Sequence, residues 1–206
     1  MNAIRVKICG ITSIADAQIA VKAGADAIGL VFYERSPRAV SVDQARAIAA
    51  SVGPFVTVVG LFVDADKTFV QDVLANVALH VLQFHGDESR EYCEQFQRPY
   101  MKAIRMRPEL DVEQAINEYP SAAAILLDAY RPGVPGGTGE TFDWQRVPAQ
   151  ASRPIVLAGG LTAENVALAI ESTHVYGVDV SGGVESSPGK KDPQKIEQFI
   201  YNAKRA

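Results

Sequence analysis

Apolar residues follow two different spacings along the chain. Short apolar runs, typical of strands buried on both faces, alternate with stretches in which apolar residues recur at helical spacing. The helical stretches include Ser13–Ala23, Val42–Ala50, Lys67–Asn76 and Ala163–Ile170. The runs that predict strands are Ile4–Cys9, Ala27–Phe32, Phe55–Val63, Leu79–Phe84, Tyr100–Ile104, Ala123–Asp128, Ile155–Leu157 and Tyr176–Val180. The pattern therefore predicts eight βα units.

Eight βα units predict a closed barrel. Parallel strands joined by right-handed crossovers close into the α/β fold called the (β/α)8 or TIM barrel, which needs at least about 200 residues. The 206 residues suffice for a single such domain over 1–206, whereas two domains would each be small. An open doubly wound sheet is the alternative, but no Gly-x-Gly-x-x-Gly motif follows the first strand. Helix caps are expected at Thr12, Ser41 and Thr162.

Charge and hydropathy exclude several classes of partner. The formal charge of −4 comes without a basic stripe, so we do not expect nucleic acid as a partner. The apolar runs are far shorter than the roughly 20 residues that cross a bilayer. The N-terminus lacks the charged region, long apolar region and small-residue cleavage site of a signal peptide. The two cysteines, Cys9 and Cys93, lie in segments of different character and do not predict a disulfide. We expect a cytoplasmic protein without membrane contact, either a monomer or a homodimer.

Two residues with acid–base chemistry stand at the ends of predicted strands. Cys9 closes the first strand and Asp128 closes the sixth. Catalytic residues of (β/α)8 barrels lie at the carboxyl ends of the strands, and two long connections, residues 33–40 and 129–142, leave the same rim. A free thiol has a pKa of about 8.5, so Cys9 would need surroundings that favour its thiolate. Lys7, two residues earlier on the same face of the strand, could provide them.

Glycine-rich turns follow the last three strands. Glycine lets backbone N–H groups approach an anion closely, without any basic side chain. Barrels of this kind commonly bind phosphate after strands seven and eight. The sequence therefore predicts a small phosphorylated ligand at the turns Gly136-Gly137-Thr138-Gly139, Gly159-Gly160 and Ser181-Gly182-Gly183.

The motifs, taken in order, resemble those of the phosphoribosylanthranilate isomerase family of tryptophan biosynthesis. The match runs from the first strand to the last helix. Each motif alone is weak, whereas the ordered set is highly specific. The segments that carry it are Lys7-Ile8-Cys9-Gly10, Gly29-Leu30-Val31-Phe32 with Ser36-Pro37-Arg38, Gln83-Phe84-His85-Gly86, Leu126-Leu127-Asp128, Gly137-Thr138-Gly139, Ala158-Gly159-Gly160-Leu161 and Asp179-Val180-Ser181-Gly182-Gly183-Val184-Glu185.

The resemblance implies an isomerase that needs no cofactor and no metal. Its reaction is the Amadori rearrangement of N-(5-phosphoribosyl)anthranilate to 1-(2-carboxyphenylamino)-1-deoxyribulose 5-phosphate. The family's general base falls on Cys9 and its general acid on Asp128, and Arg38 falls on the residue expected to contact the anthranilate carboxylate. One acid and one base suffice, because the nitrogen of the substrate itself accepts the electrons.

Other polar residues and other functions have to be weighed against this interpretation. His85, after the fourth strand, could line the pocket or be a hydrogen-bonded structural residue, and Asp179 could meet a sugar hydroxyl. Cys93 is expected to pack in a helix. A metal-dependent sugar-phosphate epimerase would need His and carboxylate ligands at several strand ends, where only His85 is so placed. A barrel that merely binds a phosphorylated ligand would not need both Cys9 and Asp128.

Overall fold

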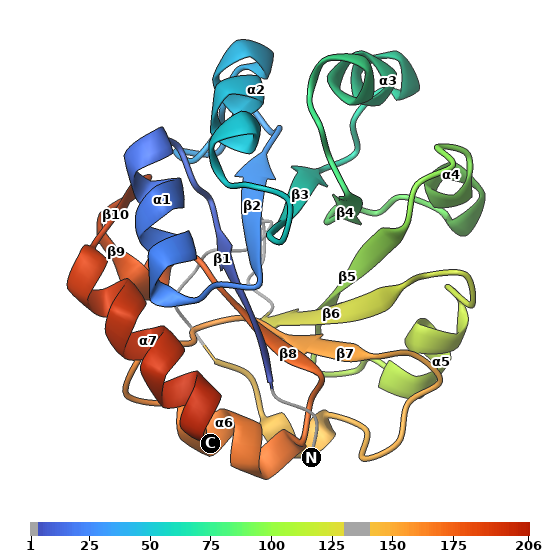
Figure 1. The fold of residues 1–206 in the computed structure, drawn as a ribbon. Coiled ribbons are helices and arrows are strands. Elements are labelled where there is room, and N and C mark those ends of the chain that lie inside the picture. Colours follow the sequence, from blue (N-terminus) through green and yellow to red (C-terminus); the bar gives the residue numbers. More distant parts are fainter. Residues whose placement is uncertain (1–3, 130–140) are drawn as a thin grey trace.

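The computed structural model is a closed barrel of eight strands that follow one another in chain order (Figure 1). The structure describes residues 4–129 and 141–206. All neighbouring strands are parallel, and the eighth strand closes the barrel against the first, where Asp179 lies opposite Lys7. The predicted (β/α)8 fold is confirmed.

The strands lie close to their predicted positions. The sixth runs one residue beyond Asp128, and the third starts at Thr57 instead of Phe55. Phe55 lies in a turn with its side chain 97% exposed, because the preceding Gly53 and Pro54 favour a turn over a strand. The strands are β1 (Arg5–Cys9), β2 (Ala27–Val31), β3 (Thr57–Phe62), β4 (Val81–Phe84), β5 (Tyr100–Met106), β6 (Ala124–Ala129), β7 (Ile155–Leu157) and β8 (Gly177–Val180).

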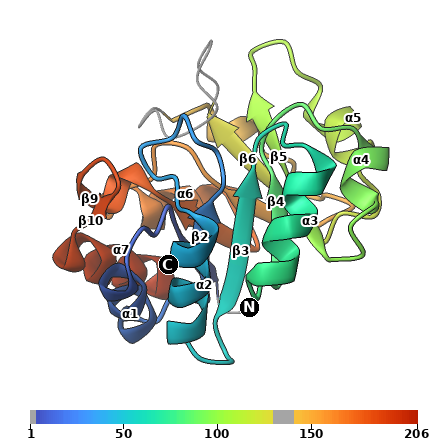
Figure 2. The same ribbon diagram turned by 90° about the horizontal axis from the view of Figure 1, so that it is seen from above.

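Helices cover the outside of the barrel (Figures 1 and 2). They are α1 (Ile14–Ala23), α2 (Val42–Ser51), α3 (Lys67–Asn76), α4 (Arg90–Glu94), α5 (Val112–Asn117), α6 (Val166–Thr173) and α7 (Pro193–Arg205). Between β6 and β7 the described residues form only the short 3-10 turn η1 (Trp144–Arg146), so they do not show the complete sixth βα unit that was predicted. α7 packs beside α1, α6 and β1 and so covers the closure of the barrel.

A small hairpin follows β8 at the rim of the barrel. It consists of β9 (Glu185–Ser187) and β10 (Lys190–Lys191), reached through the 3-10 turn η2 (Gly182–Val184). The Thr12 hydroxyl donates a hydrogen bond to the Gly189 carbonyl in this hairpin. The predicted cap at Thr12 is therefore wrong.

The helix starts show how local polar residues compete for the cap position. Ser41 caps α2 as predicted, through its side-chain oxygen. α1 is capped by Ser13, whose side chain accepts from the Asp16 N–H. The predicted cap at Thr162 is also wrong, because α6 begins at Val166 and its N-cap residue is Asn165. Residue propensities locate the start of a helix only to within a few residues, so they do not distinguish between neighbouring polar residues as the cap.

Side chains alternate between the outside and the inside of the barrel. Outward-facing residues such as Phe62 and Phe84 are fully buried under the helices. Near the carboxyl ends of the first three strands, Cys9, Val31 and Leu61 form a small apolar group of their own. The middle of the barrel is filled by Val59, Met101, Ala103, Leu126, Val156 and Ala158. The middle of the barrel is therefore a packed core, and Cys9 lies above it at the carboxyl ends of the strands.

Candidate active site

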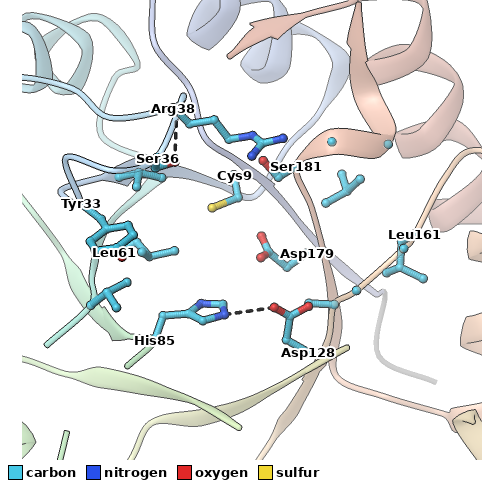
Figure 3. A pocket seen from close by; sticks show the side chains of 18 of the residues that line it. Cys9, Tyr33, Ser36, Arg38, Leu61, His85, Asp128, Leu161, Asp179 and Ser181 are labelled. Atoms are coloured by element: carbon cyan, nitrogen blue, oxygen red, sulfur yellow. Dashed lines mark hydrogen bonds and ion pairs between the residues drawn. The ribbon is translucent and has the colours of Figure 1, made fainter. Parts of the chain in front are cut away.

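One pocket opens at the carboxyl ends of the strands (Figure 3). Lys7 lies beneath its floor, two residues before Cys9 on β1. Gly137 and Gly139 lie outside the described residues, so their place in the phosphate site stays a prediction. The pocket brings together the other predicted site residues, which are Cys9, Arg38, His85, Asp128, Gly159, Gly160, Asp179, Ser181, Gly182 and Gly183.

Space for the Cys9 thiol is made by a glycine on the neighbouring strand. Gly29 of β2 lies opposite Cys9 in the register of the sheet. A Cβ atom at position 29 would lie 2.7 Å from Cys9 Sγ and 3.0 Å from Lys7 Nζ. No role was expected for Gly29 from the sequence, although a glycine inside a strand is a recognised sign of close approach by another group.

A buried ion pair lies directly below the thiol. Lys7 Nζ is 2.8 Å from Asp179 Oδ1, and both side chains are less than a tenth exposed. Burial acts to lower the pKa of Lys7, but its interactions with the Asp179 carboxylate and with Cys9 outweigh burial, so the pKa is raised. Lys7 therefore stays charged beside Cys9.

The surroundings of Cys9 do not favour its thiolate, in contrast to what was expected from the sequence. Burial raises the pKa of the Cys9 thiol, and the opposing charge of Lys7 does not overcome it. The Asp179 carboxylate adds to the rise, because it disfavours a second negative charge nearby. The protein surroundings of Cys9 therefore favour the neutral thiol.

Asp128 is held by two hydrogen bonds inside the barrel mouth. Its Oδ1 accepts from the Ala129 N–H at 2.9 Å, and its Oδ2 lies 3.0 Å from His85 Nε2. The other ring nitrogen of His85, Nδ1, lies 2.9 Å from the side-chain nitrogen of Gln83. His85 therefore fits both hypotheses made from the sequence, because it lines the pocket and is also hydrogen-bonded. Gln83 was not singled out from the sequence.

Arg38 is fixed by a carboxylate from the other end of the chain. Its Nε and Nη2 each donate to Glu185 at 2.8 Å, a two-pronged contact that suits the planar guanidinium. Lys191 Nζ lies 2.9 Å from the same carboxylate and also donates to the Ser181 carbonyl. The hairpin of β9 and β10 therefore ties the rim loop of Arg38 to the turn after β8. Glu185 ends the family motif that begins at Asp179, but no role was expected for it from the sequence.

The glycine turns after β7 and β8 pack closely against neighbouring backbone. Gly159 and Gly160 have φ angles of 82° and 62°, in the left-handed region that favours glycine. A Cβ atom at Gly183 would overlap the Leu161 carbonyl oxygen. These turns therefore require glycine for their shape, and they line one side of the pocket.

Known proteins match the chain over nearly its whole length. A family model described as N-(5'phosphoribosyl)anthranilate (PRA) isomerase matches residues 6–202. The chain belongs to this isomerase family. An N-(5'-phosphoribosyl)anthranilate isomerase of Cellvibrio japonicus (strain Ueda107) is 72% identical over 206 residues, covering 100% of this chain and 96% of the relative.

Solved structures of the isomerase family share the fold. Phosphoribosyl anthranilate isomerase from Thermotoga maritima matches with a TM-score of 0.91 and 43% identity, covering 98% of this chain and 100% of that chain. A phosphoribosyl anthranilate isomerase in complex with reduced 1-(o-carboxyphenylamino)-1-deoxyribulose 5-phosphate matches with a TM-score of 0.85 and 41% identity, with the same coverage. The resemblance found in the sequence motifs is confirmed.

Other reactive residues lie away from the pocket. Cys93 of α4 is buried in the core, as predicted, and burial raises its pKa to about 12. His80 Nδ1 accepts a hydrogen bond from the Val58 N–H, near the start of β3. Within residues 4–129 and 141–206, no group of three or more His, Cys, Asp or Glu residues is arranged to hold a metal ion. No helix in these ranges is long and apolar enough to cross a membrane.

Proposed function

We propose that the protein catalyses the Amadori rearrangement of N-(5-phosphoribosyl)anthranilate to 1-(2-carboxyphenylamino)-1-deoxyribulose 5-phosphate in tryptophan biosynthesis. The observation that carries this proposal is that Cys9 and Asp128 face the same pocket as the glycine turns. Membership of the isomerase family supports it independently. The relative that holds a reduced form of the same aminoketose phosphate supports the choice of ligand.

Asp128 acts first, as the general acid. It gives its proton to the ribose ring oxygen while the bond from that oxygen to C1 breaks. The lone pair of the anilino nitrogen forms a double bond to C1, which leaves a positively charged iminium. The two hydrogen bonds to Asp128 then stabilise the carboxylate that remains.

Cys9 acts second, as the general base. Its thiolate removes the proton from C2, and the electrons of that C–H bond move through C1 to the nitrogen, which gives an enolamine. The enol becomes the ketone when C1 gains a proton and the 2-hydroxyl loses one. Burial raises the pKa of Cys9, and the positive charge of the iminium acts in the opposite direction, so formation of the iminium favours the thiolate that removes the C2 proton.

The two ends of the substrate meet different walls. The phosphate lies at the turns after β7 and β8, where backbone N–H groups can approach it. The anthranilate ring lies against Tyr33, Leu61 and Val63, which give the opposite wall an apolar surface. Two of the five N–H groups of Arg38 are bound to Glu185, so the anthranilate carboxylate meets the remaining ones.

A fluorescence assay tests the proposal. Purified protein is mixed with freshly generated phosphoribosylanthranilate, and the loss of anthranilate-type fluorescence is followed. We expect turnover by the wild-type protein, in the presence of a metal chelator as well, and little turnover by Cys9→Ala or Asp128→Asn. Absence of turnover by the wild-type protein would refute the function. Turnover of pentulose phosphates that depends on added metal would favour the epimerase instead.

We further propose that residues 1–206 form one domain and that the protein is a cytoplasmic homodimer without nucleic-acid partners. A related isomerase from Thermotoga maritima is described as dimeric, which supports the homodimer over the monomer. Light scattering on the purified protein tests the assembly. We expect about twice the chain mass of 22.2 kDa, and a mass equal to one chain would establish the monomer.

A further inference from the structure

Gln83 is a buried polar residue that the proposed reaction leaves without a role. It lies on β4 and its side chain is 0% exposed. Its side-chain nitrogen is 2.9 Å from His85 Nδ1, and His85 Nε2 is 3.0 Å from Asp128 Oδ2. Gln83 therefore contacts the proposed acid through a single intervening ring, and Figure 3 shows the contact between that ring and Asp128.

The contact with Gln83 determines which nitrogen of His85 carries the proton. An amide nitrogen can only donate, so Nδ1 must accept and the ring proton lies on Nε2. His85 then donates to Asp128 Oδ2, while the Ala129 N–H donates to Oδ1. Each carboxyl oxygen thus accepts one hydrogen bond from the protein. The proton that Asp128 delivers is left on a lone pair that points away from these two donors and is free for the substrate.

The other tautomer of His85 would misdirect this proton. With the ring proton on Nδ1, Nε2 would be an acceptor, and the Asp128 proton would be drawn into a hydrogen bond with the ring. After proton transfer to the substrate, Nε2 would also present a lone pair to the new carboxylate instead of an N–H group. The tautomer therefore affects both the supply of the proton and the stability of the carboxylate left behind.

The carbonyl half of the Gln83 side-chain amide indicates that Gln83 does not occupy this position for the stability of its own hydrogen bonds. Its Oε1 is buried and has no hydrogen-bond partner among the described residues. A buried carbonyl without a partner is unfavourable, and such groups are rare in folded proteins. The register neighbour of Gln83 on β5 is Met101, so the interior beside Gln83 accommodates an unbranched apolar side chain.

We propose that Gln83 is a positioning residue, which selects the Nε2–H tautomer of His85 and so keeps the Asp128 proton directed at the substrate. This inference rests on the proposed role of Asp128 as the general acid. Gln83 does not line the pocket, whereas His85 and Asp128 do, so Gln83 acts through His85.

Nitrogen NMR on protein labelled with 15N-histidine tests the tautomer directly. His80 is an internal reference, because its Nδ1 accepts from the Val58 N–H at 2.9 Å and its proton must also lie on Nε2. We expect His85 and His80 of the wild-type protein to show the same pattern, with Nε2 protonated and Nδ1 not. A protonated Nδ1 in His85 would overturn the inference without any substitution being made.

Kinetics of Gln83→Met separate the role in chemistry from a role in packing. Methionine has nearly the same length as glutamine and removes the donor. We expect kcat to fall about 10- to 100-fold with KM little changed, as is typical for the loss of an outer partner that orients a functional histidine. The NMR signals of His85 should move toward a mixture of tautomers while those of His80 stay unchanged. Met101→Leu, at the register position beside Gln83 on β5, is the packing control and should keep kcat within about twofold.

The outcomes for Gln83 and Asp128 are separable. If Gln83→Met keeps wild-type kcat while Asp128→Asn loses activity, the inference on Gln83 fails and the proposed function stands. If Asp128→Asn itself keeps activity, the role of the acid fails. Equal losses in Gln83→Met and Met101→Leu would assign Gln83 to packing and refute the positioning role.

Discussion

The two sides of the pocket are built from different parts of the polypeptide. After β7 and β8 the wall is made of backbone, in turns whose glycines bring carbonyl and N–H groups close together. At the ends of β1, β4 and β6 the wall is made of side chains, and each of these has a buried polar neighbour. Cys9 has Lys7, and Asp128 has His85.

This difference separates binding from chemistry. A wall of backbone holds an anion by shape and by fixed dipoles, and it does not change its protonation state during the reaction. A wall of side chains can move protons, but its behaviour depends on which groups are charged. We therefore expect substitutions on the glycine side to change KM, and substitutions on the side-chain side to change kcat.

Removal of the general base Cys9 should have the largest effect on kcat among substitutions in the side-chain wall. Cys9→Ala should lower kcat by about 10²–10⁴-fold, because proton abstraction from C2 loses its base. The fold should survive, since only one small side chain leaves the core. Cys9→Ser should also be poor, because a hydroxyl is far less acidic than a thiol. Steady-state kinetics check this, and a near-wild-type kcat in Cys9→Ala would remove Cys9 from the mechanism.

Replacement of the general acid Asp128 tests whether the reaction needs its proton. Asp128→Asn keeps the size of the side chain but cannot protonate the ring oxygen, so kcat should fall by about 10²-fold or more while ligand binding changes little. A substrate analogue that is already open should bypass Asp128 and still require Cys9. If the open analogue suffers as much as the closed sugar, Asp128 is a binding residue and Asp179 becomes the next candidate for the acid.

Arg38 lies between the two walls and should behave as a binding residue. Arg38→Ala should weaken binding of the anthranilate carboxylate by about 1.5–3 kcal/mol, the usual contribution of such a charged hydrogen bond. The measurement compares binding of a substrate analogue that has the carboxylate with one that lacks it. Equal losses for the two analogues would contradict the contact.

A pair of adjacent glycines tests the backbone wall. In Gly183→Ala the new Cβ atom would overlap the Leu161 carbonyl, so the turns after β7 and β8 must move apart. We expect a loss of about 1–3 kcal/mol in the free energy of unfolding and a higher KM. Gly182→Ala is the matched control, because its Cβ atom would meet only Arg38 Nη2, at 3.4 Å. Equal effects of the two substitutions would show that close backbone contact is not what shapes the site.

The smallest expected effect depends on pH and concerns Glu185. Burial acts to raise the pKa of Glu185, but Arg38 and Lys191 outweigh it, so the folded pKa is lowered. The stabilisation is therefore present above the unfolded pKa of about 4.3 and is lost as pH falls through the folded value. Glu185→Gln should cost about 1–2 kcal/mol at pH 7 and progressively less below about pH 4. Urea unfolding at both pH values measures this, and a cost independent of pH would exclude the ionic contribution.

The residues at the strand ends and in the glycine turns were the parts of the site that could be predicted from sequence. Cys9 and Asp128 follow continuous apolar runs, and parallel strands in a barrel bring their carboxyl ends to one rim. Gln83 and Glu185 were missed, because their roles are set by contacts across the fold. Glu185 meets Arg38 across 147 residues of chain, and His85 meets Asp128 across 43.

The sequence by itself determined the order of the strands, the rim that carries the chemistry and the family. These follow from periodicity and from short motifs, which are local properties of the chain. Only the tertiary structure decided the charge around Cys9, the orientation of Arg38 and the hydrogen bonds of Asp128. Burial and electrostatic interactions depend on distances through space, and closing the barrel between β1 and β8 creates those distances.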